Sequence, residues 1–205
     1  MNYQKFRNAL FELACFTPNQ VFARQPGFDK NNIGRWVKKG MLIKLRNGHY
    51  CFPEYLAEPN FALYIANRIY RPSYISLHSA LSFYGIIPEA VVQITSVATL
   101  KTAGFVNQFG TYAYKTIKPD MMFGYDQKPF LKGRTLLIAQ PEKALLDLLY
   151  LYPFYNTKKE LEALRLDDDF MKDTLNVEIL RNYTAKFSSQ ALGKRVELLL
   201  NIYGL

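Results

Sequence analysis

The sequence predicts an α+β fold that begins with three helices and a β-hairpin and continues into a mixed α/β body. Apolar residues recur at helical spacing in the first 40 positions, and an Asn-Gly dipeptide then separates two short alternating runs. Both β-like runs and amphipathic helical stretches follow after residue 60. With 205 residues and 49% hydrophobic side chains, the chain is large and apolar enough to bury a core.

The first two helices are predicted by apolar spacing and by a capping signal. Apolar residues recur at helical intervals from Phe6 onward, which predicts a helix over the first 15 residues. Thr17 and Pro18 then mark the start of a second helix, because a threonine hydroxyl can cap free amides and proline suits the first helical position. This short helix is expected to end before Pro26.

A third helix is predicted between Asp29, which can cap its first turn, and Gly40, whose left-handed conformation would end it. On a helical wheel Ile33 and Val37 share the core-facing side, with Trp36 beside them. The opposite side contains asparagine and arginine, which pair bidentately with adenine and guanine edges, and lysines that can contact phosphates. The residues assigned to this outer side and its ends are Lys30, Asn31, Asn32, Arg35, Lys38 and Lys39.

A β-hairpin is predicted in the segment LIKLRNGHYCF, because Asn47 and Gly48 suit a two-residue turn in which both positions have positive φ. This turn would pair Arg46 with His49, Leu45 with Tyr50, Lys44 with Cys51 and Ile43 with Phe52. Alternation would then place Ile43, Leu45, Tyr50 and Phe52 inward and Lys44, Arg46, His49 and Cys51 outward.

Three helices followed by a basic hairpin are typical of a winged helix-turn-helix, in which the hairpin, or wing, touches DNA beside a recognition helix. The wing residues expected to contact DNA are Lys44, Arg46, Asn47 and His49.

Positive charge is concentrated in this N-terminal part. The formal net charge is +9, and residues 1–53 contain nine basic and two acidic side chains, whereas residues 54–205 contain 17 basic and 15 acidic ones. A compact basic patch attracts polyanions, so double-stranded DNA is the expected partner. A basic face kept only for solubility and a winged helix that binds a protein are the alternatives.

Two domains are predicted, a winged-helix domain over residues 1–53 and a C-terminal regulatory domain over residues 54–205. The proline-containing connector PEYLAEPN between them is expected to act as a hinge. In the second domain, helices are expected over 60–70, over YISLHSALSFYGI with a stop at Gly85, from Pro141 onward, and over VEILRNYTAKF and SQALGKRVELLLNIY. Strands are expected at VVQITSVAT, TYAYKTIK and TLLIA, with loops or strand ends at 105–109 and 123–126.

The sequence contains few residues suited to catalysis or metal binding. Cys15 and Cys51 are too few for a disulfide framework or a cysteine zinc site, and His49 and His78 are the only histidines. Phosphate-binding glycine loops, the hydrolase GxSxG motif and the HExxH motif do not occur. We therefore expect no enzymatic activity, no catalytic or metal-binding residue and no cofactor.

The alternative function is a nucleic-acid-processing enzyme with a degenerate, nuclease-like C-terminal domain. Asp120, Asp126 and the neighbours Glu142 and Lys143 would then surround a metal ion. Adjacent residues diverge on a helix, however, which favours a glutamate in a first helical turn followed by an exposed lysine. Lys143 and Asp147 lie four residues apart and are expected to pair.

The expected location is the cytoplasm. The apolar runs are far shorter than the roughly 20 residues of a membrane-spanning helix. The first residues alternate between polar and apolar side chains and contain no signal-peptide cleavage site.

Five segments of the chain, taken together, resemble the AbiE-type abortive-infection antitoxins, which are transcriptional regulators of type IV toxin–antitoxin systems. The segments are, in order, WVKKGMLIKLRNGHYCF, YISLHSALSFYGIIPE, ITSVAT, FGTYAY and AQPEKALLDLLY. The resemblance implies an N-terminal winged helix that represses its own operon by binding promoter repeats. It also implies a C-terminal domain that counteracts a nucleotidyltransferase-like toxin without needing to touch it.

The resemblance also assigns roles to individual positions of this sequence. It implies that the DNA-reading residues are Asn31, Arg35, Lys38, Lys44, Arg46 and His49. Members of the family often have a second basic residue in the wing turn, where this sequence has Asn47. The expected function is therefore that of a DNA-binding repressor and antitoxin in antiviral defence.

Overall fold

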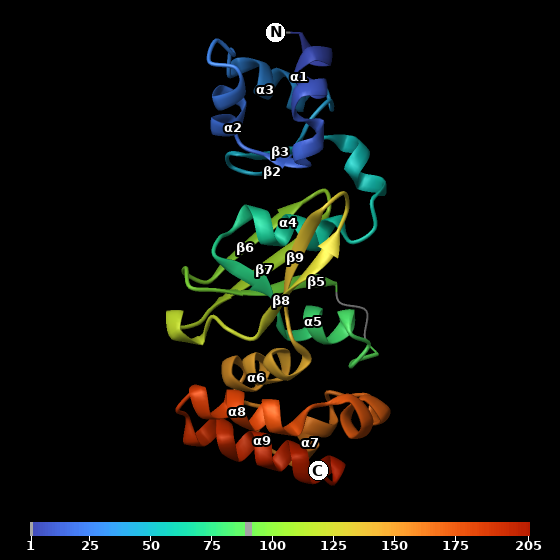
Figure 1. The fold of residues 1–205 in the computed structure, drawn as a ribbon, viewed down its shortest axis with the longest axis vertical. Coiled ribbons are helices and arrows are strands. Elements are labelled where there is room, and N and C mark those ends of the chain that lie inside the picture. The colour runs from blue at the N-terminus through green and yellow to red at the C-terminus, as the bar shows by residue number, and fades with distance from the viewer. Residues whose placement is uncertain (1, 89–91) are drawn as a thin grey trace.

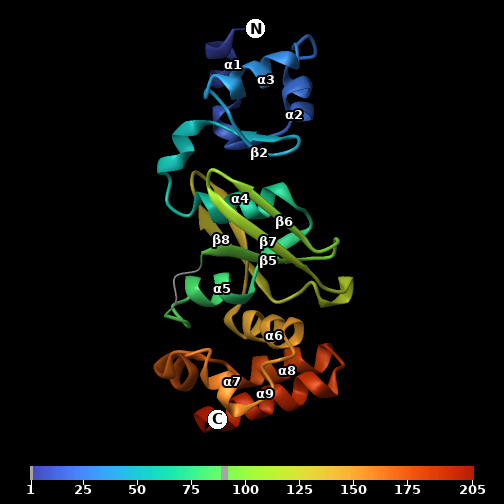
Figure 2. The same cartoon turned by 180° about the vertical axis from the view of Figure 1, so that it is seen from behind.

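The computed structural model of the chain describes residues 2–88 and 92–205. Its elements are stacked in three tiers along the long axis, with the two chain ends at opposite poles (Figure 1). The first tier contains three helices and a small sheet, the second is built on a six-stranded sheet, and the third is a layer of helices. The view from behind shows the same order (Figure 2). Helices and strands both form the core, which confirms the predicted α+β class.

The first tier, residues 2–52, is called the N-terminal unit. Its helices are α1 (Tyr3–Leu10), α2 (Pro18–Arg24) and α3 (Asn31–Lys38), and its strands are β1 (Cys15–Phe16), β2 (Ile43–Arg46) and β3 (His49–Cys51). The strands pair antiparallel in the order β1-β3-β2. Aromatic rings fill the space between the helices and the sheet. The ring of Phe6 lies 4.6 to 6.1 Å from those of Phe16, Phe28, Trp36 and Phe52.

Local signals place the ends of α2 and α3 as predicted. The Thr17 hydroxyl accepts a hydrogen bond from the Gln20 N–H, and the Gln20 side chain accepts one from the Thr17 N–H, so a capping box starts α2. The helix ends at Arg24, before Pro26. Beyond α3, Gly40 has a φ of +69°, the left-handed conformation that ends a helix.

The first helix is shorter than predicted, because a strand follows it. α1 ends at Leu10, a 3₁₀ turn covers Phe11–Leu13, and Ala14 has a φ of +58°. The chain then joins the sheet as β1, which pairs with β3. The apolar spacing favours a helix over the first 15 residues, but the pairing of β1 with the distant β3 ends the helix earlier.

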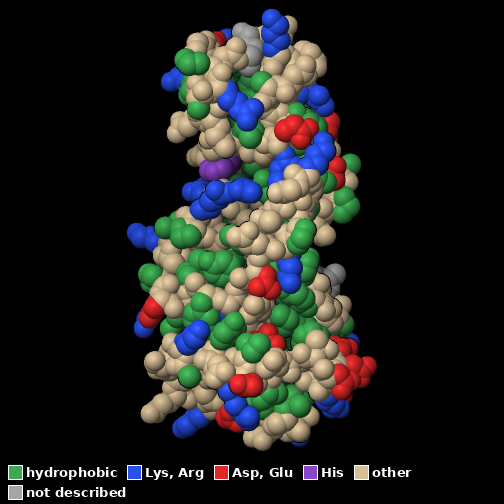
Figure 3. Space-filling model, in the orientation of Figure 1, with side chains coloured by type: hydrophobic (Ala, Val, Ile, Leu, Met, Phe, Trp, Pro, Cys, Tyr) green, Lys and Arg blue, Asp and Glu red, His purple; other side chains and the backbone are tan. Residues whose placement is uncertain are grey.

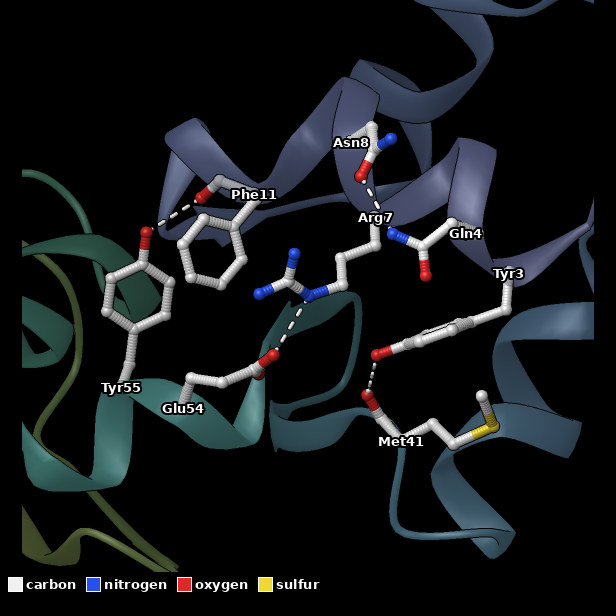
Figure 4. Close-up of polar contacts among 8 residues, drawn as sticks. All are labelled: Tyr3, Gln4, Arg7, Asn8, Phe11, Met41, Glu54 and Tyr55. Carbon is white, nitrogen blue, oxygen red and sulfur yellow. Dashed lines mark hydrogen bonds and ion pairs between the residues drawn. The ribbon is translucent and has the colours of Figure 1, made fainter.

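The connector after β3 packs against α1, which differs from the hinge that was predicted. It forms a 3₁₀ turn, η2 (Pro53–Ala57), in which Tyr55 is buried. The ring of Tyr55 stacks on Phe11 at 5.1 Å and on Phe61 at 4.7 Å, so one side chain bridges the first two tiers. Its hydroxyl also donates a hydrogen bond to the Phe11 carbonyl at 2.7 Å (Figure 4).

The second tier is a mixed sheet with the strand order β6-β7-β5-β4-β9-β8. Its strands are β4 (Ser73–Ile75), β5 (Gln93–Ala98), β6 (Ala103–Asn107), β7 (Gly110–Thr116), β8 (Tyr125–Phe130) and β9 (Arg134–Ala139). β5 runs parallel to β7 and β4 to β9, while the other neighbours are antiparallel. Helix α4 (Phe61–Ile69) lies between this sheet and the N-terminal unit, and α5 (Leu77–Phe83) lies on the opposite side of the sheet (Figure 1).

The three predicted strands are present as β5, β7 and β9, and both predicted helices of this tier are present as α4 and α5. Gly85 follows α5 with a φ of +71°, as expected of a helix stop. Val91, which begins the predicted strand VVQITSVAT, and Glu89, which ends the segment YISLHSALSFYGIIPE, lie outside the described residues. β4 was not predicted as a strand, and where β6 and β8 lie the prediction was only of loops or strand ends, at 105–109 and 123–126. β6 and β8 are the edges of the sheet, where partial exposure mixes polar with apolar residues and weakens the strand pattern.

The third tier contains α6 (Pro141–Leu151), α7 (Lys158–Glu162), a π-helical turn at Phe170–Thr174, α8 (Val177–Lys186) and α9 (Gln190–Tyr203). α6 begins at the predicted proline and packs against α5, α8 and α9, so almost all of its residues are buried. The Ser189 hydroxyl caps α9 by accepting from the Leu192 N–H at 3.3 Å. None of the helices in the two described ranges is long and apolar enough to cross a membrane.

Candidate nucleic-acid interface

Helix α3 is anchored by two buried side chains. Ile33 and Trp36 are 4% and 8% exposed, whereas Val37, which was predicted to face the core, is only partly buried. The ring of Trp36 contacts three other aromatic rings, those of Tyr3, Phe6 and Phe28. These contacts determine which side of the helix faces outward.

Both ends of α3 are also tied to their surroundings. The Asp29 carboxylate accepts a hydrogen bond from the Asn31 N–H at 2.9 Å, but the N-cap residue of the helix is Lys30, one position later than predicted. After the helix, the Met41 N–H donates to the Trp36 carbonyl at 2.9 Å, and the Met41 carbonyl accepts from the Tyr3 hydroxyl at 2.8 Å (Figure 4). The outer face of α3 therefore belongs to a helix whose inner side is buried and whose two ends make hydrogen bonds to neighbouring residues.

The outer face of α3 contains the polar and basic residues that the helical wheel placed there. The exposed members are Lys30, Asn31, Arg35, Lys38 and Lys39, and Asn32 is half-buried. In the space-filling view, blue Lys and Arg side chains are spread over the upper part of the molecule with a smaller group of red Asp and Glu side chains at its right, and the largest red group lies on one side of the third tier (Figure 3). The charge asymmetry read from the sequence is therefore also an asymmetry along the molecule.

One acidic side chain lies beside this face. Arg35 and Asp29 form an ion pair with an N–O distance of 3.0 Å, and their side chains are 63% and 49% exposed. An exposed pair of this kind contributes about 0–1 kcal/mol, so Arg35 can leave it for another partner at little cost.

The hairpin closes at the predicted turn, but most of its predicted pairing is wrong. Arg46 lies opposite His49 as predicted, but of the two turn residues only Gly48 has a positive φ, at +75°, whereas the predicted turn needs positive φ at Asn47 as well. Between Lys44 and Arg46 the register shifts by one residue, so the observed pairs are Lys44 with Tyr50 and Ile43 with Cys51. A one-residue shift exchanges the two faces of a strand. For this reason Cys51, predicted to face outward, is fully buried.

Arg46 was predicted to face solvent at the tip of the wing, and this prediction is wrong. Its guanidinium lies over the ring of Phe105 at 4.4 Å and that of Tyr70 at 5.2 Å, and it donates to the Ile69 carbonyl at 2.6 Å. A planar guanidinium stacks well on aromatic faces, and here those faces belong to the second tier. The tip of the hairpin is therefore docked on the sheet.

The other predicted wing residues differ in exposure. Lys44 and Asn47 are exposed, whereas His49 is partly buried. Burial lowers the pKa of His49, and the neighbouring charges of Arg46 and Arg71 lower it further, against the hydrogen bond to the Asn47 carbonyl that raises it. At neutral pH the imidazole is therefore uncharged, and Lys44 is the exposed charge within the predicted wing set.

Two further cations of the N-terminal unit make internal contacts. Arg7 pairs with Glu54 at 2.9 Å and lies over the ring of Phe11 at 4.2 Å (Figure 4). Arg24 donates to the Ala9 carbonyl at 2.5 Å. These contacts join α1 to the connector and α2 to α1, so α3 provides most of the accessible basic surface that the sequence analysis assigned to DNA.

Three residues of the enzyme alternative have partners of their own. The Asp126 carboxylate accepts from the Gln140 side chain at 2.9 Å, and Glu142 accepts from the Asn176 N–H at 3.0 Å. Lys143 pairs with Asp147 as predicted.

Lys143 was expected to be exposed, and this expectation is wrong, because its ammonium lies among the rings of Tyr74, Phe123 and Phe187. In the described ranges no three His, Cys, Asp or Glu residues are grouped as metal ligands would be.

The structure thus groups the α3 residues on one face and separates Arg46 and His49 from them. It also brings Arg68, Arg71 and Arg134, which the sequence analysis did not single out, to one cavity between the first two tiers. The short spacing in NRIYRP was the one local sign of this cluster.

No protein-family model matches the chain, and no curated protein sequence matches it.

Proposed function

We propose that the chain is a DNA-binding transcriptional repressor that reads its operator with the outer face of α3. The observation that carries the proposal is the grouping of Asn31, Arg35 and Lys38 on the exposed side of a helix anchored by Trp36. Their spacing of four and three residues aligns them on one helical face. An α-helix with its side chains is about 10–12 Å across, which fits a major groove about 12 Å wide.

Each side chain of this face suits a distinct part of DNA. Asn31 can pair bidentately with adenine, and Arg35 with guanine once it leaves Asp29. Lys30 and Lys39 flank the helix and suit the phosphates on either side of the groove. Phosphate neutralisation would supply most of the affinity, so binding should weaken steeply as salt increases.

We also propose that residues 1–53 form a winged helix-turn-helix domain and residues 54–205 a separate regulatory domain. The element order helix, strand, helix, helix, strand, strand and the sheet order β1-β3-β2 support the first assignment. Because Arg46 is docked on the second tier, the wing would approach DNA with Lys44 and Asn47.

The biological role follows from the resemblance to AbiE-type antitoxins. In this role the protein would bind repeats in its own promoter in the cytoplasm, and residues 54–205 would counteract a nucleotidyltransferase-like toxin without needing to touch it. The support for this part of the proposal is the ordered set of sequence segments.

The test is a fluorescence-anisotropy titration of the full chain with DNA from upstream of its own gene and with scrambled DNA, over a salt series. Tighter binding to the upstream fragment with a steep salt dependence is expected. Arg35→Ala should cost about 1–3 kcal/mol on the upstream fragment and reduce its preference over scrambled DNA. Lys39→Ala should weaken both DNAs about equally and reduce the salt slope by about one.

The matched control is Arg181→Ala, which removes an exposed arginine from the third tier, where it pairs with Glu197 at 3.3 Å. This variant should bind both DNAs as the wild type does. Equal affinity for the two DNAs, or an unchanged titration for both α3 variants, would contradict the proposal.

A further inference from the structure

A cavity of about 440 Å³ lies between the N-terminal unit and the second tier. Its upper wall includes Thr17, Gln20 and His49 of the N-terminal unit. Its lower wall is formed by Tyr64 and by three arginines, Arg68 near the end of α4, Arg71 two residues after that helix and Arg134 on β9. The volume lies within the range of small-molecule sites, about 300–1,000 Å³.

The positive charge of this cavity is not balanced by the protein. Within the described residues, none of the three guanidiniums has a carboxylate within 4 Å. Glu12, the acidic residue of the lining, has its carboxylate 3.2 Å from the Lys132 ammonium outside the cluster. In Figure 3 blue side chains gather at the narrow waist of the molecule beside a purple histidine.

Neutral acceptors position two of the guanidiniums without neutralising them. Arg71 donates to the Asn67 carbonyl at 3.0 Å, and Arg134 donates to the carbonyls of Leu131 and Glu12. Peptide carbonyls orient a guanidinium but carry no charge, so the strong charge-assisted partner is still missing.

The clearest evidence for a missing partner is at Arg68. Its guanidinium lies 4.6 Å from the centre of the Tyr64 ring, and its buried Nε atom has no hydrogen-bond partner among the described residues. A buried polar group without a partner is costly, which is a reason to expect a ligand there. The nearby positive charge of Arg68 also helps burial to lower the pKa of Arg71, as expected of cations held close together.

We propose that this cavity is a phosphate-binding site in which Arg68, Arg71 and Arg134 hold the oxygens of one phosphate-bearing ligand. Guanidinium groups bind phosphate bidentately, and two at the end of α4 with a third on β9 can contact one phosphate group from two directions. A second cavity of about 570 Å³, which Arg68 and Arg71 also line, offers room for an organic part beside Met122, Tyr125 and Leu137. Burial raises the pKa of the Cys15 thiol in the lining to about 12, so the thiol stays protonated and the site binds instead of reacting.

The ligand would join the N-terminal unit to the second tier, since both contribute walls of the cavity. This inference does not rest on DNA reading by α3, because the site lies on other elements and is measured without DNA. The phosphate could come from a small molecule or from the DNA backbone, and the experiment has one arm for each source.

In the first arm, inorganic pyrophosphate is titrated calorimetrically into the full-length wild type, Arg71→Gln and Arg181→Gln. Arg71 is exposed, so its replacement should leave the fold intact, which a circular dichroism melt checks. Saturable binding that is weakened about tenfold or more by Arg71→Gln and unchanged by Arg181→Gln is expected for a small phosphate ligand. Arg68→Gln should weaken it as well.

In the second arm, the same three proteins bind double-stranded DNA over a salt series. If the phosphate belongs to the DNA backbone, pyrophosphate does not bind, and Arg71→Gln lowers both the affinity for DNA and the salt slope by about one. The proposal is overturned if Arg71→Gln and Arg181→Gln behave alike in both arms. Pyrophosphate binding without DNA binding would overturn only the repressor proposal.

Discussion

Arg35 and Asp29 form an ion pair on the surface of the N-terminal unit, whereas Lys143 and Asp147 form one inside the third tier. The side chains of the first pair are 63% and 49% exposed, and those of the second are both fully buried. The chemistry of the two pairs is similar, but water surrounds only the first. An exposed pair can open at little cost and offer its cation to a ligand, whereas a buried pair must stay closed.

The buried pair is part of a polar network in which the partners satisfy one another. Asp147 accepts hydrogen bonds from the Tyr74 hydroxyl at 2.8 Å and the Ser76 hydroxyl at 2.7 Å. Lys143 also donates to the Tyr74 hydroxyl at 2.8 Å and lies 5.0 Å from the centre of the Phe123 ring. Burial lowers the pKa of Lys143 and raises that of Asp147, and contact between the two opposes both shifts. The comparison identifies this network as structural and the outer face of α3 as the surface available to a partner.

The largest effect is expected when one charge of the buried pair is removed. Asp147→Asn keeps the shape of the side chain but leaves Lys143 buried without a counter-charge, so the free energy of unfolding should fall by about 3–5 kcal/mol. Urea denaturation at neutral pH measures the change. The matched substitution Asp29→Asn should cost no more than about 1 kcal/mol. Similar losses for the two variants would show that burial does not separate the pairs.

A smaller effect is expected at the hairpin, where two neighbouring cations again differ in burial. Arg46→Ala removes the contacts with Tyr70, Phe105 and the Ile69 carbonyl, and should lower the free energy of unfolding by about 1–3 kcal/mol. Lys44→Ala removes the same charge from an exposed position and should stay within about 0.5 kcal/mol of the wild type. Thermal and urea unfolding both report the difference. If the two variants were equally stable, the docking of the hairpin tip on the second tier would be wrong.

The smallest effect is expected at the exposed pair of Arg35 and Asp29, and it is an effect on the affinity for DNA. Asp29→Asn retains an oxygen that can accept the Asn31 N–H but removes the negative charge beside Arg35. Affinity for DNA should rise by up to about fivefold at about 0.1 M salt, and the gain should shrink at about 0.2 M salt because exposed charges are screened. Anisotropy titrations at the two salt concentrations measure it. A decrease in affinity would mean that Arg35 needs Asp29 to hold it in position.

Much of the fold could be predicted because its signals are local. The capping box at Thr17, the left-handed Gly40, the Asn47-Gly48 turn and the proline start of α6 each depend on residues within about four positions of one another. The outer face of α3 could be predicted for the same reason, since helical geometry places residues three and four apart on one side. Edge strands β6 and β8 were predicted only as loops or strand ends because their half-exposed pattern resembles that of loops.

Contacts between distant segments decided the remaining features. Cys51 is buried because β1 joins the sheet and the register of the hairpin shifts, and Arg46 is docked because the aromatic rings of Tyr70 and Phe105 lie below it. Lys143 looks like a surface lysine in the sequence, yet its ammonium is enclosed because the rings of Tyr74, Phe123 and Phe187, which lie far from it in the sequence, pack around it. A residue type and its near neighbours set the local backbone, but whether a charge meets water, a ring or another charge depends on which segments fold against it.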